Sequence, residues 1–160
     1  MSDCLFCKLK DVKEDVIWEN EYFYSILDVN PVNPGYALVI SKRHVPDILN
    51  LNDEEWLHLK TAIAETIYAV KKIDLVKIYK KLANNQNNER SKKLCESMIK
   101  DPNIRKEPDA YNIGVNNGEA AGRTIHHVHI HIIPRFKGDA NNAAGGIRHI
   151  LRHKDIGVEK

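Results

Sequence analysis

Five short segments of the chain have the hydrophobic pattern of β-strands, with alternation of period two or a compact apolar run. They lie at residues 16–18, 22–27, 36–40, 111–115 and 125–133. The segment 36–40 is almost wholly apolar, which is typical of a strand buried on both faces. Pro134 follows the last segment and is expected to end it, because proline has no N–H to donate to a neighbouring strand.

One long helix is predicted over residues 52–73. Asn52 can cap its first turn, and Glu55 stands three residues later, where it can return a hydrogen bond to the cap. Apolar residues then recur at helical spacing, at Trp56, Leu59, Ile63, Ile67 and Val70. This stripe favours packing against a core. The pattern as a whole predicts an α+β fold, with an antiparallel sheet of about five strands and this helix packed on it.

The segment 74–108 differs in character from the rest of the chain. Lysine-rich helical stretches flank the polar, low-complexity tract 84–88, NNQNN. Such a tract buries too little apolar surface to order itself. We therefore expect an inserted, partly mobile excursion within a single domain over residues 1–148, followed by a C-terminal tail over 149–160.

Composition narrows the range of partners. The 160 residues include 24 Lys plus Arg and 22 Asp plus Glu, so the net charge is +2. This balance predicts no general affinity for nucleic acid or membrane, although a small anionic ligand remains compatible with it. No apolar run approaches the ~18 residues of a spanning helix, and the first residues lack a secretory signal pattern. Three cysteines, an odd number, favour a reducing, cytoplasmic compartment.

The strongest chemical feature is a histidine row, formed by His127, His129 and His131. Side chains on a strand alternate faces, so these three share one face while apolar residues occupy the other. Such a row serves either metal binding or nucleophilic catalysis. Same-face neighbours are ~7 Å apart along a strand, whereas Zn–N bonds are only ~2.0–2.1 Å long. Three in-line histidines cannot share one ion without a bend, which favours divided roles.

The residues around this row resemble the histidine triad (HIT) family of nucleotide hydrolases and transferases. The segment 122–135, GRTIHHVHIHIIPR, is similar to the family's triad motif. Further similar blocks occur in the family's order, at residues 4–7, 27–28, 35–44 and 116–118. The resemblance covers residues 4–72 and 110–148 and implies a HIT-like fold.

The resemblance implies a role for each matching residue. His129 would be the nucleophile that attacks the α-phosphorus, and His131 would hydrogen-bond the phosphate or the bridging oxygen. Asp28 would hold the ribose hydroxyls. Asn116 and Thr124 would contact the phosphate and the leaving group.

It also implies the surroundings of the nucleotide. The base would lie among apolar residues near Phe6, Ile26 and Leu27. Arg123 stands where the family usually has Gln, and its positive charge beside the phosphates favours a polyphosphate over a phosphoramidate. Family members are typically homodimers, so a homodimer is expected.

A zinc site is expected on the same grounds. Cys4 and Cys7 alone are a weak signal, because a closed tetrahedral site needs four ligands. The zinc-bearing branch of the family completes the site at positions that correspond here to His44 and His127. A structural zinc would then orient His127 and support His129. The alternative is two free thiols, with the ring of His127 bonded to a backbone carbonyl.

The leading functional hypothesis is hydrolysis of a dinucleoside polyphosphate such as diadenosine tetraphosphate, with release of a mononucleotide. A nucleoside phosphoramidase or general nucleotidyl hydrolase is the closest alternative. A nucleotide-binding regulator with vestigial chemistry is another. A purely structural zinc module fails to explain why His129 and His131 accompany His127.

Overall fold

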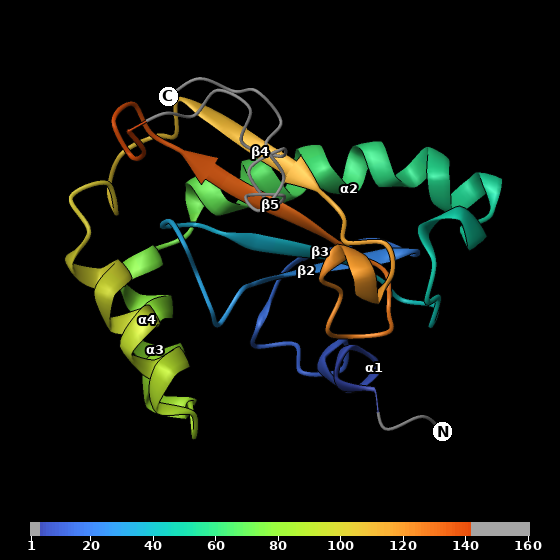
Figure 1. Ribbon diagram of the computed structural model, residues 1–160, viewed down its shortest axis with the longest axis horizontal. Coiled ribbons are helices and arrows are strands. Elements are labelled where there is room, and N and C mark those ends of the chain that lie inside the picture. Colours follow the sequence, from blue (N-terminus) through green and yellow to red (C-terminus); the bar gives the residue numbers. More distant parts are fainter. Residues whose placement is uncertain (1–3, 142–160) are drawn as a thin grey trace.

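The computed structural model describes residues 4–141 and contains one antiparallel sheet in the order β1-β2-β3-β5-β4 (Figure 1). The strands are β1 Val16–Glu19, β2 Phe23–Leu27, β3 Ala37–Ser41, β4 Ala110–Gly114 and β5 His129–Arg135. The α-helices are α1 Leu5–Leu9, α2 Asp53–Lys72, α3 Leu75–Asn85 and α4 Glu89–Lys100. Short 3-10 turns occupy Ile48–Asn50 and Glu119–Ala121. The predicted α+β fold and the five strands are confirmed.

The two faces of the sheet bury different clusters. On one face, α2 packs over β1, β2 and β3, and its Leu59 and Ala62 join Val39 and Ile130 in the main core. On the other face, α1 supplies Phe6 to a smaller cluster with β2 and β3. All five residues of β3 are buried, as the apolar run predicted, because β3 lies at the centre of the sheet with a layer on each side.

The histidine strand is shorter at its start than expected and longer at its end. β5 begins at His129, so His127 lies just before it, and β5 continues through Pro134 to Arg135. The expectation that Pro134 ends the strand is wrong. The Pro134 carbonyl accepts a hydrogen bond from Asn33 Nδ2 at 2.8 Å, so the backbone polar groups of Pro134 face the β3 side. The last β3–β5 pair is Ala37 with Ile132, and no strand needs the missing N–H.

The first turn of α2 is held by a capping box. Asn52 accepts from the Glu55 N–H at 2.8 Å, and Glu55 accepts from the Asn52 N–H at 2.9 Å. Glu55 is 3% exposed and also receives two hydrogen bonds from Arg43, at 2.6 and 2.8 Å. The Arg43 guanidinium holds the pKa of this carboxyl below its usual range. Trp56, which was expected in the apolar stripe, is 45% exposed, because the buried face follows Leu59 and its helical neighbours.

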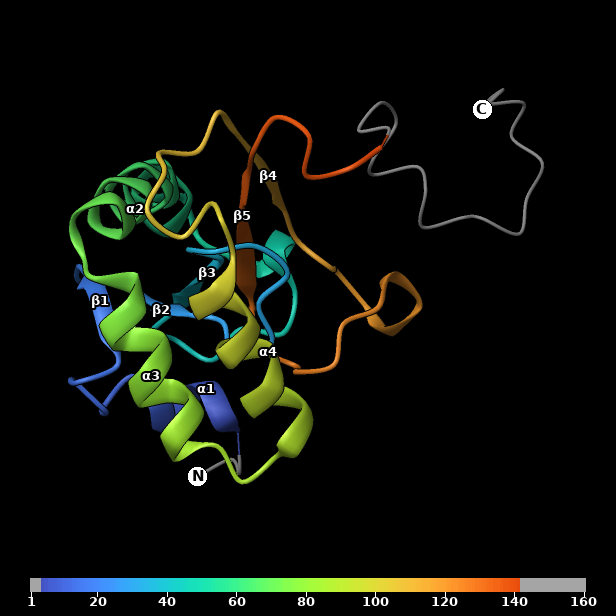
Figure 2. The same cartoon turned by 90° about the vertical axis from the view of Figure 1, so that its left-hand side faces the viewer.

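The segment 74–108 forms a helical hairpin of α3 and α4 at one end of the sheet (Figures 1 and 2). The tract 84–88 takes a defined conformation within this hairpin. Residues 84 and 85 end α3, and Asn88 caps α4 by accepting from two backbone N–H groups. Tyr79 and Cys95 are fully buried in the main core. Apolar contacts with the domain supply the burial that the tract itself lacks.

Two further sequence predictions concern the C-terminal residues and membrane-spanning helices. Residues 142–148 of the expected domain and the tail 149–160 lie outside the described residues. Within residues 4–141, no helix has both the length and the apolar content needed to cross a membrane.

Replacing Glu55 by Gln should destabilise the protein by about 1–2 kcal/mol. Glutamine can retain the cap, but it loses the charge that Arg43 faces. Asp53→Asn is the matched control, since Asp53 is an exposed acidic residue of the same first turn. Urea unfolding at pH 7 measures the difference. The difference should shrink as the pH falls toward the lowered pKa of Glu55. Equal midpoints for the two variants would contradict the prediction.

Candidate functional site

Four side chains that are far apart in the sequence meet beside the N-terminal helix. Cys4 and Cys7 come from the start of α1, His44 from the loop after β3, and His127 from the residues just before β5. Their ligand atoms all lie within 4.8 Å of one another, so this group can hold a metal ion. The sequence prediction named these four residues.

The donor set and the spacing fit zinc. Cys4 Sγ and Cys7 Sγ lie 3.4 and 3.6 Å from His127 Nδ1, and Cys7 Sγ lies 3.3 Å from His44 Nδ1. A tetrahedral zinc, with bonds of ~2.3 Å to sulfur and ~2.0 Å to nitrogen, separates its ligand atoms by about 3.3–3.8 Å. The residues present therefore suit zinc, which would tie α1 to the chain at the start of β5.

The His127 ring connects this metal group to the sheet. Its Nε2 lies 2.6 Å from the Ser41 carbonyl, which can only accept, so Nε2 carries the proton. Nδ1 therefore presents a lone pair toward the thiols. Burial lowers the pKa of His127 to about 4, so the ring is neutral at neutral pH. The ring therefore makes the carbonyl bond expected in the absence of zinc, and its Nδ1 can still serve as a metal ligand.

The His129 ring is oriented by the backbone of His127. Its Nδ1 lies 2.8 Å from the His127 carbonyl, so Nδ1 donates and Nε2 is left with a lone pair. Phe6 packs edge-on against the ring, with centroids 5.0 Å apart. His129 is 6% exposed. An imidazole in this tautomer, with a free Nε2, has the arrangement that nucleophilic attack requires.

His131 completes the row, and its ring centroid lies 4.9 Å from that of His129. Tyr36 Oη lies 2.7 Å from His131 Nδ1. Within residues 4–141, no hydrogen-bond partner is found for the buried His131 Nε2. When the Tyr36 hydroxyl donates to Nδ1, Nε2 carries a proton that is free to be donated to a ligand oxygen. Burial lowers the pKa of His131 to about 4, so this ring is neutral near pH 7.

Asp28 directly follows β2, at the start of the loop that leads to β3. Its Oδ1 accepts from the Asn30 N–H at 2.7 Å. Burial raises the pKa of Asp28 above its ordinary value, while the Asn30 bond and the charge interaction with His129 act in the opposite direction. The carboxylate is therefore half-buried and within electrostatic reach of His129. Its role toward ribose stays a prediction.

Of the three apolar residues predicted around the base, Phe6 and Ile26 lie in one buried cluster, whereas Leu27 does not. Phe6 packs on the histidine row, whereas Leu27 belongs to the main core on the opposite face of the sheet. Ile26 and Leu27 line a cavity of about 80 Å³ together with Ile78 and Leu82 of α3. The sequence does not predict this contact of α3 with β2, because nothing in the local pattern relates 74–108 to β2.

The loop between β4 and β5 carries three further predicted residues. Asn116 is half-buried and Thr124 is exposed. Arg123 donates to the Pro46 carbonyl, and its Nη2 lies 3.4 Å from His126 Nδ1. Arg123 therefore braces this loop against the segment after His44. The proposed contacts of all three residues with phosphate stay predictions.

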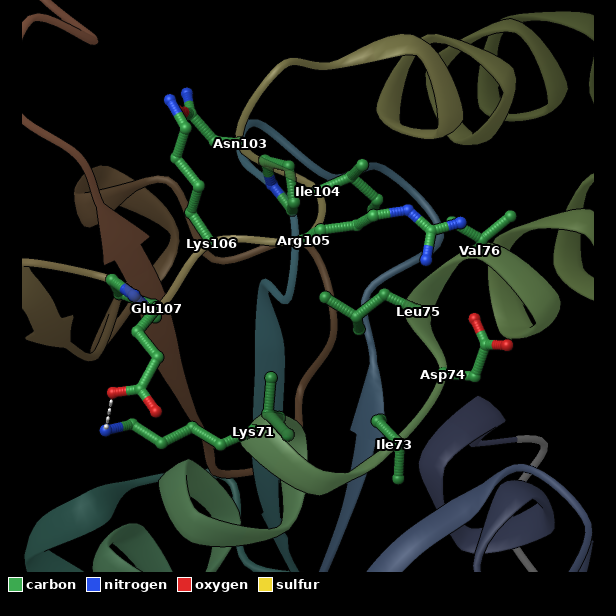
Figure 3. Close-up of a pocket in the computed structure, with 13 residues that line it drawn as sticks. Lys71, Ile73, Asp74, Leu75, Val76, Asn103, Ile104, Arg105, Lys106 and Glu107 are labelled. Carbon is green, nitrogen blue, oxygen red and sulfur yellow. Dashed lines mark hydrogen bonds and ion pairs between the residues drawn. The ribbon is translucent and has the colours of Figure 1, made fainter.

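A larger cavity, of about 220 Å³, lies away from the histidine row (Figure 3). It is bounded by the end of α2, the start of α3 and the return segment 103–108, and Lys71 pairs with Glu107 at its edge at 3.3 Å. None of the residues that line it was predicted to bind nucleotide. The volume of this cavity is not by itself a reason to prefer it as the functional site. The histidine row has oriented hydrogen-bond donors and acceptors.

Comparison with known proteins identifies the family. The model of the HIT domain matches residues 10–138, most of the chain. The chain belongs to the HIT family. The matched part of this HIT domain includes the histidine row and His44 but begins after Cys4 and Cys7. The thiol half of the metal group therefore lies outside the matched part.

Several curated proteins resemble this HIT domain. A HIT-like protein of Methanocaldococcus jannaschii is 30% identical over 85% of this chain and 81% of its own length. An adenylylsulfatase of Arabidopsis thaliana is 30% identical over 92% of this chain and 59% of its own. The AP-4-A phosphorylase of Mycobacterium tuberculosis is 25% identical over 84% of this chain. The match spans about half of that enzyme, 53% of its length.

Solved structures share the fold. A HIT family protein of Bacillus anthracis aligns over 86% of this chain and 77% of its own, with 26% identity and a TM-score of 0.59. A zinc-bound histidine triad protein of Mycobacterium smegmatis aligns over 88% of this chain and 80% of its own, with 26% identity and a TM-score of 0.52. The second of these relatives holds the metal that the Cys/His group here fits.

Substituting His44 by Ala should remove bound zinc, because three ligands hold the ion far less tightly than four. The wild-type HIT domain should carry about one ion per chain, and the variant much less, with a lower melting temperature. His126→Ala is the control, since His126 adjoins His127 in sequence but lies on the surface. Elemental analysis of the purified proteins measures the metal. Zinc retained at the wild-type level by His44→Ala would refute the assignment.

Acidification should destabilise this HIT domain partly through His131. Its pKa is about 4 in the folded protein and about 6.5 when unfolded. Below pH 6.5 only the unfolded chain takes up this proton, so stability falls until the pH reaches about 4. In His131→Asn the loss of unfolding free energy between pH 7 and pH 4.5 should be smaller by roughly 1–3 kcal/mol. Equal losses in urea titrations would contradict the shift.

Proposed function

We propose that this HIT domain is a nucleotide hydrolase that cleaves a dinucleoside polyphosphate, such as diadenosine tetraphosphate, through a covalent nucleotidyl-histidine intermediate. The observation that carries the proposal is the 2.8 Å hydrogen bond from His129 Nδ1–H to the His127 carbonyl. It leaves His129 Nε2 unprotonated and fixed in direction, which a nucleophilic imidazole requires.

The proposed reaction has two displacements at one phosphorus. His129 Nε2 attacks the α-phosphorus, a P–N bond forms, and the bridging P–O bond breaks with its electron pair leaving on the nucleoside triphosphate. Water then attacks the same phosphorus, the P–N bond breaks, and a nucleoside monophosphate is released. His131 Nε2, for which residues 4–141 offer no hydrogen-bond partner, would carry a proton and donate it in a hydrogen bond to a phosphate oxygen, which supports the charge that develops there.

The relatives support this class of reaction. One is named an AP-4-A phosphorylase and another an adenylylsulfatase, so named enzymes of the family act on nucleotide phosphorus compounds. In this proposal Arg123 supplies a positive charge to the phosphates, which favours a longer polyphosphate chain. A purine nucleoside phosphoramidase on the same histidines is the nearest alternative, and a nucleotide-binding regulator is a further one.

The proposed zinc is structural. Cys4, Cys7, His44 and His127 would hold it, and it would supply a fixed link between α1 and the start of β5. The homodimer and the cytoplasmic location stay predictions. The proposed partner is a small-molecule nucleotide.

His129→Ala should lower kcat on diadenosine tetraphosphate by at least ~10³-fold, because the variant has lost its nucleophile. His126→Ala, which alters an exposed neighbour in the same motif, should retain activity. Mass spectrometry after a rapid alkaline quench should find a nucleotidyl group on His129 of the wild type. Substantial turnover by His129→Ala would refute the mechanism. A kcat/KM much higher on adenosine phosphoramidate than on diadenosine tetraphosphate would favour the alternative, a nucleoside phosphoramidase.

A further inference from the structure

The α3–α4 hairpin contacts both ends of the loop that joins β2 to β3. This loop covers residues 28–36. It begins at Asp28, the proposed ribose ligand, and ends at Tyr36, whose hydroxyl lies 2.7 Å from His131 Nδ1. Figure 2 shows α3 and α4 beside the ends of β2 and β3, where this loop runs. The hairpin therefore borders the segment that connects the proposed ribose ligand Asp28 to Tyr36, the contact of His131.

At the far end of the loop, α3 holds the backbone next to Tyr36. Tyr79 is fully buried, and its hydroxyl accepts from the Gly35 N–H at 2.9 Å. Gly35 has a φ of +83°, and an added Cβ would lie 2.9 Å from Val70 Cγ1. The backbone at Gly35 is thus held between α2 and α3, directly before the tyrosine that orients His131.

At the near end of the loop, α4 reaches the proposed ribose carboxylate through one intermediate. Ser91 is 5% exposed, and its hydroxyl donates to Asn30 Oδ1 at 2.8 Å. The Asn30 N–H donates in turn to Asp28 Oδ1 at 2.7 Å. Cys95 Sγ lies 3.5 Å from the Val29 carbonyl. Two hydrogen bonds, joined through the side chain and the backbone of Asn30, therefore connect Ser91 to Asp28.

The hairpin is also anchored to other parts of the domain. Lys81 of α3 pairs with Asp15 at 2.8 Å and with Glu14 at 3.4 Å, just before β1. Tyr79 and Cys95 are fully buried in the main core. An element fixed in this way can hold the 28–36 loop in one geometry.

We propose that the α3–α4 hairpin positions the 28–36 loop for nucleoside recognition, with Ser91 and Tyr79 as its positioning residues. The part of the substrate that depends on it is the ribose, because the connection from Ser91 through Asn30 ends on Asp28. This inference rests on the proposed function through the role of Asp28.

Ser91→Ala should lower kcat/KM for diadenosine tetraphosphate about three- to tenfold, the effect of one lost hydrogen bond. The change should lie mainly in KM. The analogue with 2′-deoxyribose should be affected less, so the preference for ribose should narrow. Ser97→Ala is the matched control, because the Ser97 hydroxyl bonds the Leu94 carbonyl of its own helix. A purely structural role for Ser91 would weaken both substrates equally.

A double-mutant cycle tests the route through Asn30. Asn30 is exposed, and Asn30→Ala removes the Ser91 acceptor while keeping the backbone N–H that Asp28 uses. The double variant should be no worse than Ser91→Ala alone, whereas independent effects would add. Additive effects would overturn the proposed connection.

Equilibrium binding of AMP and 2′-deoxy-AMP separates this inference from the proposed function. If the wild type turns over the substrate and prefers ribose, but Ser91→Ala keeps that preference, the hairpin inference fails and the hydrolase stands. If the wild type has no turnover, the hydrolase proposal fails. The hairpin inference then stands only if Ser91→Ala narrows the binding preference for AMP, and fails if it does not.

Discussion

The arrangement of the site depends on the 2.6 Å hydrogen bond between His127 Nε2 and the Ser41 carbonyl at the end of β3. With Nε2 committed to that carbonyl, Nδ1 faces Cys4 and Cys7, and the backbone of His127 is held where its own carbonyl can accept from His129. One residue thus sets the tautomers of two rings. A flipped His127 ring would place an N–H among the thiols and leave the Ser41 carbonyl without this donor.

Much of the site was predictable because its causes are local or carried by the family motif. Strand alternation placed His129 and His131 on one face, and the structure keeps them there, with ring centroids 4.9 Å apart. The capping box at Asn52 and Glu55 was likewise readable from a spacing of three residues. The metal group needed the family resemblance, since Cys4 and Cys7 lie far in sequence from His44 and His127.

The parts that could not be predicted depend on tertiary contacts. Trp56 fits a helical stripe by spacing, but the positions of β1, β2 and β3 beneath α2 decide which face of the helix is buried. The sequence around Tyr36 does not indicate that its hydroxyl contacts His131, because that contact follows from the β3–β5 register. The helices of 74–108 were foreseen, but their burial was not, since their apolar residues, among them Tyr79 and Cys95, alternate with many lysines and show no partner in the local sequence.

Pro134 has a consequence beyond its own strand. By the register of β3 and β5, it stands opposite Gly35, where a further pair would require an N–H that proline lacks. Its carbonyl is taken by the Asn33 side chain, and the Gly35 N–H turns instead to Tyr79. Pro134 therefore limits the length over which β3 and β5 are hydrogen-bonded to each other. The residues before Ala37 are therefore not paired with β5, and a neighbouring helix can bind their backbone, as α3 does at Gly35.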